Sequence, residues 1–298
     1  MVAIALVLGM AACGGDGDSD NNNDVDRGPT TIATTASLNG LYWDADGSKL
    51  YLTDDSSNAL RVWDGSEGFS QSAALPDAPA SGATLGQIVR ASDGVLYVTR
   101  FGFGVDGTVI AVSPAGDSYN LTGLDATRRR IGLANTPDGS LIVGWFIKGG
   151  SGALSELLVD GSQAQESELV TGLGKPVGVA VVGDRLLVSD QNSGHVLEYS
   201  LSAVRANPAT AEDGKVLATF TTLDGIDLMA AASDGTLYFG GSGGSLFALD
   251  AAGKVSVLAS GWPKLRGVSV DEANRRIFVA AAAVDEQSTP SLRIVPMD

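Results

Sequence analysis

Short runs of apolar residues, many of them β-branched or aromatic, recur along the whole chain and are separated by polar turns rich in Gly and Asp. The first clear unit covers residues 38–64. Its apolar positions are Trp43, Leu50, Leu52, Leu60 and Val62. A period of two predicts strands with one buried face, and Asp46-Gly47 predicts a tight turn between the first two strands. The unit therefore predicts three consecutive antiparallel strands.

The same unit recurs five more times, at intervals of about 40 to 50 residues. The equivalent turns begin at Asp93, Asp138, Asp184, Asp234 and Asn274. A more polar fourth strand follows in the first five units, and a spare strand at residues 30–35 can complete the sixth by pairing with residues 292–295. Radial four-stranded units of this length are typical of a β-propeller. We predict an all-β, six-bladed β-propeller over residues 29–298, with four-stranded antiparallel blades and the last blade closed by the N-terminal strand.

Composition and charge narrow the classes of partner. The chain has 298 residues, of which 44% are hydrophobic and 39 are Gly, and its net charge is -16. Nucleic acid binding needs Lys and Arg to neutralise phosphates, so this acidity argues against a nucleic-acid partner. It argues equally against electrostatic attraction to anionic lipid.

The N-terminal residues differ from the rest. Residues 1–12 form a short apolar run, which is typical of a signal peptide and too short to span a bilayer. The run ends in Met10-Ala11-Ala12-Cys13, which resembles the lipobox of bacterial lipoproteins, although no Lys or Arg precedes it. The resemblance implies cleavage before Cys13, lipidation of Cys13 and export to the cell envelope. Gly14 after Cys13 resembles outer-membrane lipoproteins of Gram-negative bacteria, with the lipid anchor as the only membrane contact.

Residues 13–28 are polar and acidic, with almost no apolar residue to bury. Such a segment does not form a packed core, and we predict a disordered tether. Cys13 is the only cysteine and His195 the only histidine. This argues against disulfides, zinc sites and Cys/His catalysis.

Two blades resemble known propeller families. Asn39-Gly40-Leu41, Trp43, Asp46-Gly47, Leu50-Tyr51 and Thr53-Asp54 resemble a blade of the regucalcin/gluconolactonase propellers. The segments 176–181 and 187–190 resemble an NHL-type blade. The first resemblance implies a divalent cation, such as calcium, held in the channel by Asn39 and Asp227 and used in the hydrolysis of a lactone or ester.

The first residues of the six innermost strands should meet at the central channel. They are Asn39, Gly86, Ile131, Val177, Asp227 and Arg266. Two oxygen ligands are few for calcium, and the guanidinium of Arg266 would oppose a cation. The alternatives are a polar plug of Asp227, Arg266 and Asn39, an organic-ligand or anion site that uses Arg266, or a metal site. Either a divalent cation or no cofactor is therefore expected.

Loops between the second and third strands border the same face. Asp54 and Asp190 are candidate general bases there, although an Asp in such a loop also caps its own backbone. Another set combines aromatic and basic side chains: Arg100, Phe101, Phe103, Trp145, Phe146 and Lys148. Exposed aromatic residues beside cations predict a recognition patch, whereas aromatic residues that pack between blades would be structural.

Two functions follow from these features. The first is a lipid-anchored, extracytoplasmic propeller that binds a protein, a glycan or a small molecule on the channel face. The second is a metal-dependent hydrolase that resembles the lactonases, with Asn39 and Asp227 holding the metal.

Overall fold

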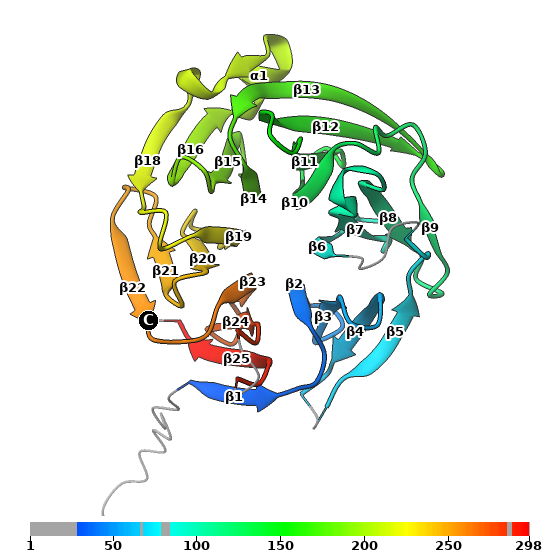
Figure 1. Ribbon diagram of the computed structural model, residues 1–298, viewed down its shortest axis with the longest axis vertical. Helices are drawn as coiled ribbons and strands as arrows, with labels where there is room; N and C mark the ends of the chain where they lie inside the picture. Colours follow the sequence, from blue (N-terminus) through cyan, green and yellow to red (C-terminus); the bar gives the residue numbers. More distant parts are fainter. Residues whose placement is uncertain (1–28, 66–67, 79–83, 285–287, 298) are drawn as a thin grey trace, which may run out of the picture.

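The computed structural model describes residues 29–65, 68–78, 84–284 and 288–297. These residues form a ring of six antiparallel sheets around a central axis (Figure 1). The predicted signal peptide and tether, including Cys13, lie outside the described residues. The prediction of an all-β, six-bladed propeller is confirmed.

The first three blades follow the chain from the innermost strand outward. Blade one contains β2 (Leu38–Asp44), β3 (Lys49–Asp54), β4 (Ala59–Trp63) and β5 (Ser70–Ala74). Blade two contains β6 (Leu85–Arg90), β7 (Leu96–Arg100), β8 (Thr108–Val112) and β9 (Ser118–Asn120), with a 3-10 turn η1 (Gly102–Gly104) between β7 and β8. Blade three contains β10 (Arg129–Asn135), β11 (Leu141–Phe146), β12 (Gly152–Asp160) and β13 (Gln163–Leu173).

The next two blades repeat the plan with one addition. Blade four contains β14 (Pro176–Val182), β15 (Arg185–Asp190), β16 (His195–Ser200) and β18 (Lys215–Thr219). Between β16 and β18 lie α1 (Leu201–Ala206), β17 (Ala209–Thr210) and η2 (Ala211–Asp213). Strand β17 pairs in parallel with β13, so blade three gains a fifth strand that the sequence did not predict. Blade five contains β19 (Ile226–Ala231), β20 (Leu237–Gly241), β21 (Leu246–Leu249) and β22 (Val255–Ala259).

Blade six joins the two ends of the described chain. It contains β23 (Leu265–Asp271), β24 (Arg276–Ala281), β25 (Ser291–Pro296) and, on the outside, β1 (Thr30–Ala33). Strand β1 is antiparallel to β25, with Thr30 opposite Ile294 and Ile32 opposite Leu292. This closure removes an exposed sheet edge and links the first described strand to the last.

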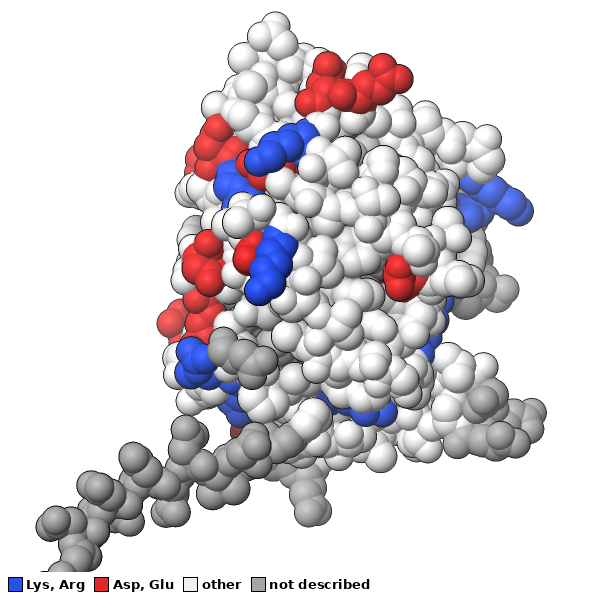
Figure 2. Space-filling model, turned by 90° about the vertical axis from the view of Figure 1, so that its left-hand side faces the viewer, with Lys and Arg blue, Asp and Glu red and all other residues white. Residues whose placement is uncertain are grey.

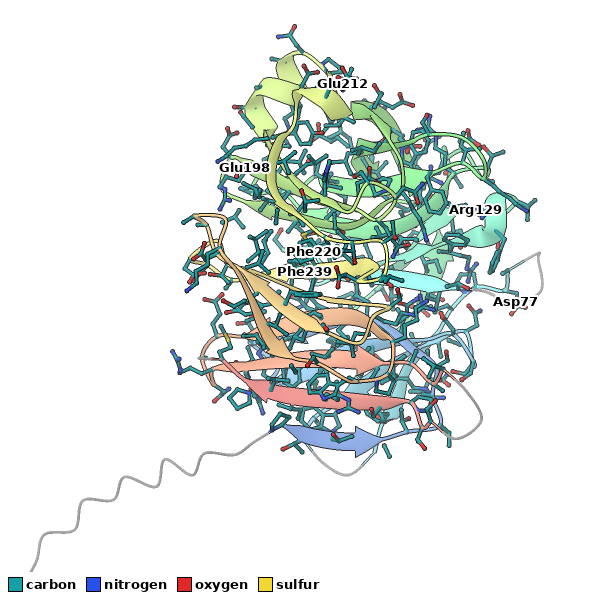
Figure 3. All side chains as sticks on the ribbon, turned by 60° about the vertical axis from the view of Figure 1, so that its left-hand side comes forward. Asp77, Arg129, Glu198, Glu212, Phe220 and Phe239 are labelled. Carbon is teal, nitrogen blue, oxygen red and sulfur yellow. The ribbon has the colours of Figure 1, made fainter. Side chains whose placement is uncertain are left out.

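The hydrophobic core lies between the blades. Six clusters of buried side chains occupy the six interfaces between adjacent blades. At the closure, the Phe278 ring of blade six lies 5.2 Å from Trp43 and 5.8 Å from Trp63 of blade one. Between blades four and five, Phe220 and Phe239 meet edge to face at 5.3 Å (Figure 3). Consecutive residues of many strands are buried and point to opposite faces, so each sheet supplies side chains to the clusters on both of its sides.

Glycine allows the innermost strands to approach closely around the axis. A β-carbon on Gly40 would overlap the carbonyl oxygen of Gly86 in the next blade, and one on Gly267 would overlap that of Asn39. Gly132 and Gly178 face the next blade in the same way. A larger residue at these positions would push neighbouring blades apart.

Charged side chains mark the outer wall. They gather mainly toward one edge of the wall, where acidic and basic residues alternate, and much of the remaining wall is uncharged (Figure 2). Arg129 and Asp77 lie at the opposite edge from Glu198 (Figure 3). The edge with Arg129 belongs to the face on which the channel described below opens.

Candidate functional site

A cavity of about 250 Å³ opens where the innermost strands begin. Each inner strand has a register shift directly after its first or second paired residue, as between Leu38 and Leu41 in β2. Such a bulge redirects a side chain out of the regular strand pattern. Five of the six residues predicted to head the inner strands line this cavity, namely Asn39, Ile131, Val177, Asp227 and Arg266.

Positive charge dominates the cavity wall. Lys175 and Lys264, which precede β14 and β23, line it together with Arg266. Burial lowers the pKa of Lys175 below its ordinary value; the Asp227 charge opposes this, and the Arg266 and Arg129 charges add to the lowering. Burial and the Arg266 charge likewise lower the pKa of Lys264. The cationic groups therefore lie close enough together to repel one another.

Among the described residues that line the cavity, Asp227 alone carries a carboxylate. Its Oδ2 lies 3.7 Å from Nη1 of Arg266, which is within range of an ion pair but long for a hydrogen bond. Its Oδ1 accepts a hydrogen bond from the backbone N–H of Leu228 at 3.1 Å. The pairing of Asp227 with Arg266, expected for the polar plug, is present.

Asn39 makes a different contact from the one expected in the plug. Its Nδ2 donates to the carbonyl oxygen of Leu85 at 2.5 Å, which ties blade one to blade two. Its amide also interacts with the carboxyl of Asp55. Asp55 accepts a hydrogen bond from the backbone N–H of Leu85 at 2.6 Å. Burial raises the pKa of Asp55 to about 7, against the lowering effects of the Leu85 N–H and Arg266.

An aromatic loop forms another part of the cavity wall. Phe101 and Phe103, at η1, both line the cavity, and their rings meet edge to face at 5.1 Å. Arg129 lies over Phe101 at 5.1 Å and donates through Nη2 to the carbonyl oxygen of Phe103 at 3.0 Å. Phe103 is 46% exposed, so this part of the predicted recognition patch does face solvent.

The other two aromatic residues of that patch do not reach the rim. Trp145 is buried, donates to Ser155 Oγ at 2.7 Å and has the guanidinium of Arg128 stacked on its ring at 3.8 Å. Phe146 is buried as well, but its ring meets that of Phe101 edge to face at 5.6 Å, and Lys175 Nζ lies 5.6 Å from its centroid. Two of the four aromatic residues thus pack inward, which is the structural alternative: Trp145 fills space between blades two and three, and Phe146 packs behind the cavity wall against Phe101.

Arg100 and Lys148 also lie outside the cavity wall. Arg100 is fully buried, donates to Asn58 Oδ1 and to the carbonyl oxygen of Pro76, and forms an ion pair with Asp106 at 3.7 Å. Lys148 is exposed on the β11–β12 loop. Arg100 therefore holds the loop before blade two in place.

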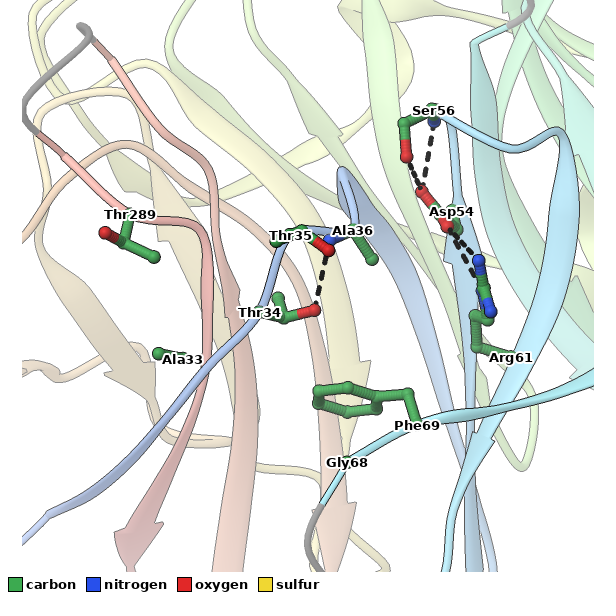
Figure 4. A pocket seen from close by; sticks show the side chains of 10 residues that line it. All are labelled: Ala33, Thr34, Thr35, Ala36, Asp54, Ser56, Arg61, Gly68, Phe69 and Thr289. Atoms are coloured by element: carbon green, nitrogen blue, oxygen red, sulfur yellow. Dashed lines mark hydrogen bonds and ion pairs between the residues drawn. The ribbon is translucent and has the colours of Figure 1, made fainter.

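The two candidate general bases are engaged by their own loops. Asp190 accepts hydrogen bonds from the backbone N–H groups of Gly174 and Lys175 and from Ser193 Oγ. Asp54 accepts from Ser56 and Ser57 and pairs with Arg61 at 3.1 Å (Figure 4). Burial alone would raise the pKa of Asp54, but these hydrogen bonds lower it overall. Both side chains act as loop caps in this geometry.

Asp54 belongs to a second, more open cavity of about 470 Å³ (Figure 4). This cavity lies between the segment 33–36, which follows β1, and Phe69 at the start of β5. The ion pair of Asp54 and Arg61 is part of its wall. The carboxylate is thus directed away from the central channel.

The channel residues do not fit a calcium site. Calcium takes six to eight oxygen ligands, whereas the cavity offers Asp227 and Asn39 beside three cations. In the part of the chain that the structure describes, no group of three or more His, Cys, Asp or Glu side chains is placed to hold a metal ion. A divalent cation here would be repelled by Arg266, Lys175 and Lys264.

Three residues near the cavity were missed from the sequence: Arg129, Lys175 and Lys264. The two lysines belong to the links from an outer strand to the next inner strand. These links border the channel face as the second-to-third loops do, and a basic residue directly before an inner strand is the signal that would have found them.

No helix in the described part of the chain is long and apolar enough to cross a membrane.

Comparison with known proteins supports the fold. No protein-family model matches the sequence, and no curated protein matches it significantly. A gluconolactonase from Xanthomonas campestris has a similar structure, with 17% identity, a TM-score of 0.71 and coverage of 91% of this chain and 89% of that one. A calcium-binding regucalcin from Agrobacterium tumefaciens shares 14% identity at a TM-score of 0.68, with coverage of 89% and 93%.

A chain of a nidogen/laminin complex is similar as well, with 17% identity, a TM-score of 0.60 and coverage of 79% of this chain and 85% of that one. An enzyme, a calcium-binding protein and a member of a protein complex therefore share this architecture, and likeness at this level of identity identifies the fold alone. The chain is a six-bladed β-propeller that resembles the gluconolactonase and regucalcin propellers in structure.

Proposed function

We propose that this protein is a lipid-anchored, extracytoplasmic propeller that binds a small organic anion at the mouth of its channel. The observation that carries the proposal is the charge of the cavity wall. Lys175, Lys264 and Arg266 line it with Asp227 as their counter-charge, in a chain of net charge -16. A local excess of positive charge in an acidic protein needs a specific reason.

The electrostatics of the wall favour an anionic ligand. The pKa values of Lys175 and Lys264 are lowered by burial and by neighbouring cations. A bound carboxylate would counter both effects, since it supplies the opposite charge within a partly desolvated site. Charge-assisted hydrogen bonds from ammonium and guanidinium groups to a carboxylate are also stronger than neutral ones.

The test is a binding titration by NMR with citrate, gluconate and 3-phenylpropionate at low ionic strength. We expect at least one of them to bind with a dissociation constant below about 1 mM, which corresponds to about 4 kcal/mol. Arg266→Gln and Lys264→Gln should each weaken that binding about tenfold. Lys215→Gln, on outer strand β18 with a side chain 70% exposed, is the matched control and should change nothing.

Two results would count against the proposal. One is that none of the three anions perturbs the resonances of the channel residues at about 20 mM. The other is that Lys215→Gln weakens binding as much as Arg266→Gln does, which would point to non-specific attraction.

The second candidate function is a metal-dependent hydrolase that acts on a lactone or ester. The structural likeness to a gluconolactonase favours it. Asn39 and Asp227 would hold the metal, but the cationic wall opposes this, and Asp190 and Asp54 are already held by their loops. Asp55, near Asn39, is better placed than either of them to accept a proton.

Elemental analysis of the purified protein, with thermal melts in EDTA and in excess calcium, separates the two functions. The anion-binding proposal expects the same melting temperature in both. About one equivalent of metal, with a melt that EDTA lowers and Asp227→Ala makes insensitive to EDTA, would favour the hydrolase instead.

A further inference from the structure

The wall of the channel cavity divides into two arcs. Its cations come from blades four and six, with Lys175 before β14 and Lys264 and Arg266 at the start of β23, and Asp227 of blade five lies between them as their counter-charge. Its apolar side chains come from blades two to four: Phe101, Phe103, Ile131 and Val177. Because the blades follow one another around the ring, the apolar and cationic arcs occupy different sides of one small cavity.

Two of the three uncharged polar side chains that line the cavity are already used within the protein. Asn39 donates to the carbonyl oxygen of Leu85. Gln191 donates to the carbonyl oxygens of Gly225 and Ile226 and accepts from Lys175 Nζ. Among the described lining residues, Thr84 is the other uncharged polar side chain. A polyhydroxylated ligand would therefore have to leave many of its hydroxyl groups without partners, which is costly in a partly desolvated site.

The aromatic loop is held in place rather than left free. Phe103 has a φ of 51°, in the left-handed region that a residue with a side chain rarely adopts. The hydrogen bond from Arg129 to its carbonyl oxygen and the ring contact with Phe101 hold this conformation. Phe103 nevertheless stays 46% exposed at the mouth of the cavity. A strained loop that presents an exposed aromatic ring beside a binding cavity is typical of a ligand contact.

The size of the cavity sets the size of the ligand. A cavity of roughly 150 Å³ suffices for benzene, and this one measures about 250 Å³. It therefore has room for one ring with a short acidic arm. The ring would lie against Phe101 and Phe103, and the acid would reach toward the cationic arc.

Resting on the proposed anion site, we infer that the ligand is an aromatic or similarly apolar monocarboxylate, and not a sugar acid. The apolar arc selects the body of the ligand, and the cationic arc binds its carboxylate. A site for a polyol would need unoccupied hydrogen-bond donors and acceptors for the hydroxyl groups of the ligand. The cavity of this protein differs from such a site.

The experiment compares three monocarboxylates in NMR titrations at one pH and ionic strength: acetate, gluconate and 3-phenylpropionate. All three carry one carboxylate, so differences report on the rest of the molecule. We expect 3-phenylpropionate to bind at least tenfold more tightly than acetate and than gluconate. Gluconate binding as tightly as 3-phenylpropionate, or more tightly, would overturn the inference and leave the anion site standing. If citrate binds while all three fail, the inference alone is overturned, and failure of citrate as well would overturn the anion site.

Substitutions of Phe103 then test whether the aromatic loop causes the preference for 3-phenylpropionate. Phe103→Ala should weaken 3-phenylpropionate at least fivefold and leave acetate unchanged, whereas Phe103→Leu should retain most of the affinity. Arg266→Gln should weaken both acids. Ile147→Ala is the matched control, because Ile147 is 42% exposed on the neighbouring β11–β12 loop and does not line the cavity. If Phe103→Ala, with an unchanged thermal melt, binds 3-phenylpropionate like the wild type, the inference is wrong.

Discussion

Asp54 and Asp55 are neighbours in the chain, yet their carboxyl groups have pKa values shifted in opposite directions. Asp54 ends β3 and accepts hydrogen bonds from Ser56 and Ser57, which lower its pKa despite its burial. Asp55 points the other way, toward Leu85 and the channel, and burial raises its pKa to about 7. Consecutive side chains at the end of a strand point to opposite sides. Asp54 therefore caps its own loop, whereas Asp55 lies beside the channel.

The raised pKa of Asp55 makes the stability of the fold depend on pH. The ordinary pKa of Asp55 is 3.8, and its pKa in the folded state is about 7. Between these two pH values the folded state binds a proton on Asp55 more tightly than the unfolded state does. Stability from this group is therefore fully present below about pH 4 and is lost as pH rises through 7. Asp55→Asn, which stays neutral, should gain about 2 kcal/mol relative to wild type on going from pH 5 to pH 8, with allowance for solvent screening.

Urea denaturation of both proteins at pH 5 and pH 8 measures this difference. Asp54→Asn is the control, because the lowered pKa of Asp54 keeps it ionised at both values, so its effect on the free energy of unfolding should be the same at pH 5 and pH 8. An Asp55→Asn effect that does not change with pH would refute the assignment.

Anion affinity should depend on pH through the same carboxyl. The charged groups around Asp55 are Asp54 in its own loop and Arg266 from β23. Asp227, Lys175 and Lys264 complete the charges of the nearby cavity. Ionisation of Asp55 adds a negative charge near the bound carboxylate, and at about 8 Å with an effective dielectric of about 40 this costs about 1 kcal/mol. The dissociation constant of 3-phenylpropionate should therefore rise roughly fivefold from pH 6 to pH 8.

Asp55→Asn should remove most of that rise. The measurement is a set of NMR titrations of wild type and Asp55→Asn with 3-phenylpropionate at three pH values. Both proteins retain Arg266, Lys175 and Lys264. Equal pH dependence in Asp55→Asn and wild type would assign the effect to another group.

The glycines of the innermost strands should be intolerant of a methyl group. Gly40→Ala would place a β-carbon against the carbonyl oxygen of Gly86, which is backbone and cannot rotate away. Overpacking of this kind costs about 1–3 kcal/mol, and we expect the upper end of that range because neither partner is a flexible side chain. Thermal denaturation measures the loss.

Gly150→Ala is the matched control. A β-carbon there meets its nearest neighbour at 3.4 Å, on Ile147, in an exposed loop. We expect its melting temperature to stay within about 2 °C of wild type. Similar losses in Gly40→Ala and Gly150→Ala would show that close approach of the blades is not the cause.

Cys13 should determine where the protein is found in the cell. Expressed from its own leader in a Gram-negative host, the wild type should fractionate with membranes and carry the mass of a lipid on its N-terminal cysteine. Cys13→Ser should appear in the soluble fraction, since one lipid modification site would be lost. Mass spectrometry of the N-terminal peptide is the direct readout. Wild-type protein with an unmodified Cys13 would contradict the predicted anchor.

Local sequence signals predicted most of the architecture. The period-two pattern around Leu50 and Leu52, with Asp-Gly turns at regular intervals, reflects strand geometry and turn chemistry within a few residues of each position. The spare strand at residues 30–35 and its pairing with β25 followed from the count of strands. Even the residues that head the inner strands, such as Asn39 and Asp227, could be aligned from the repeat.

The chemistry of the site depended on contacts between residues far apart in the chain. Arg100 and Trp145 resemble rim residues by position, yet the first is bonded to Asn58 and the second lies under Arg128. Lys175 meets Lys264 and Arg266 only after the ring closes. Burial and electrostatic potential arise from the whole ring of blades, and no pattern within one blade contains them. The repeat therefore specified the scaffold, while the folded ring determined which side chains face the channel and which charges they carry.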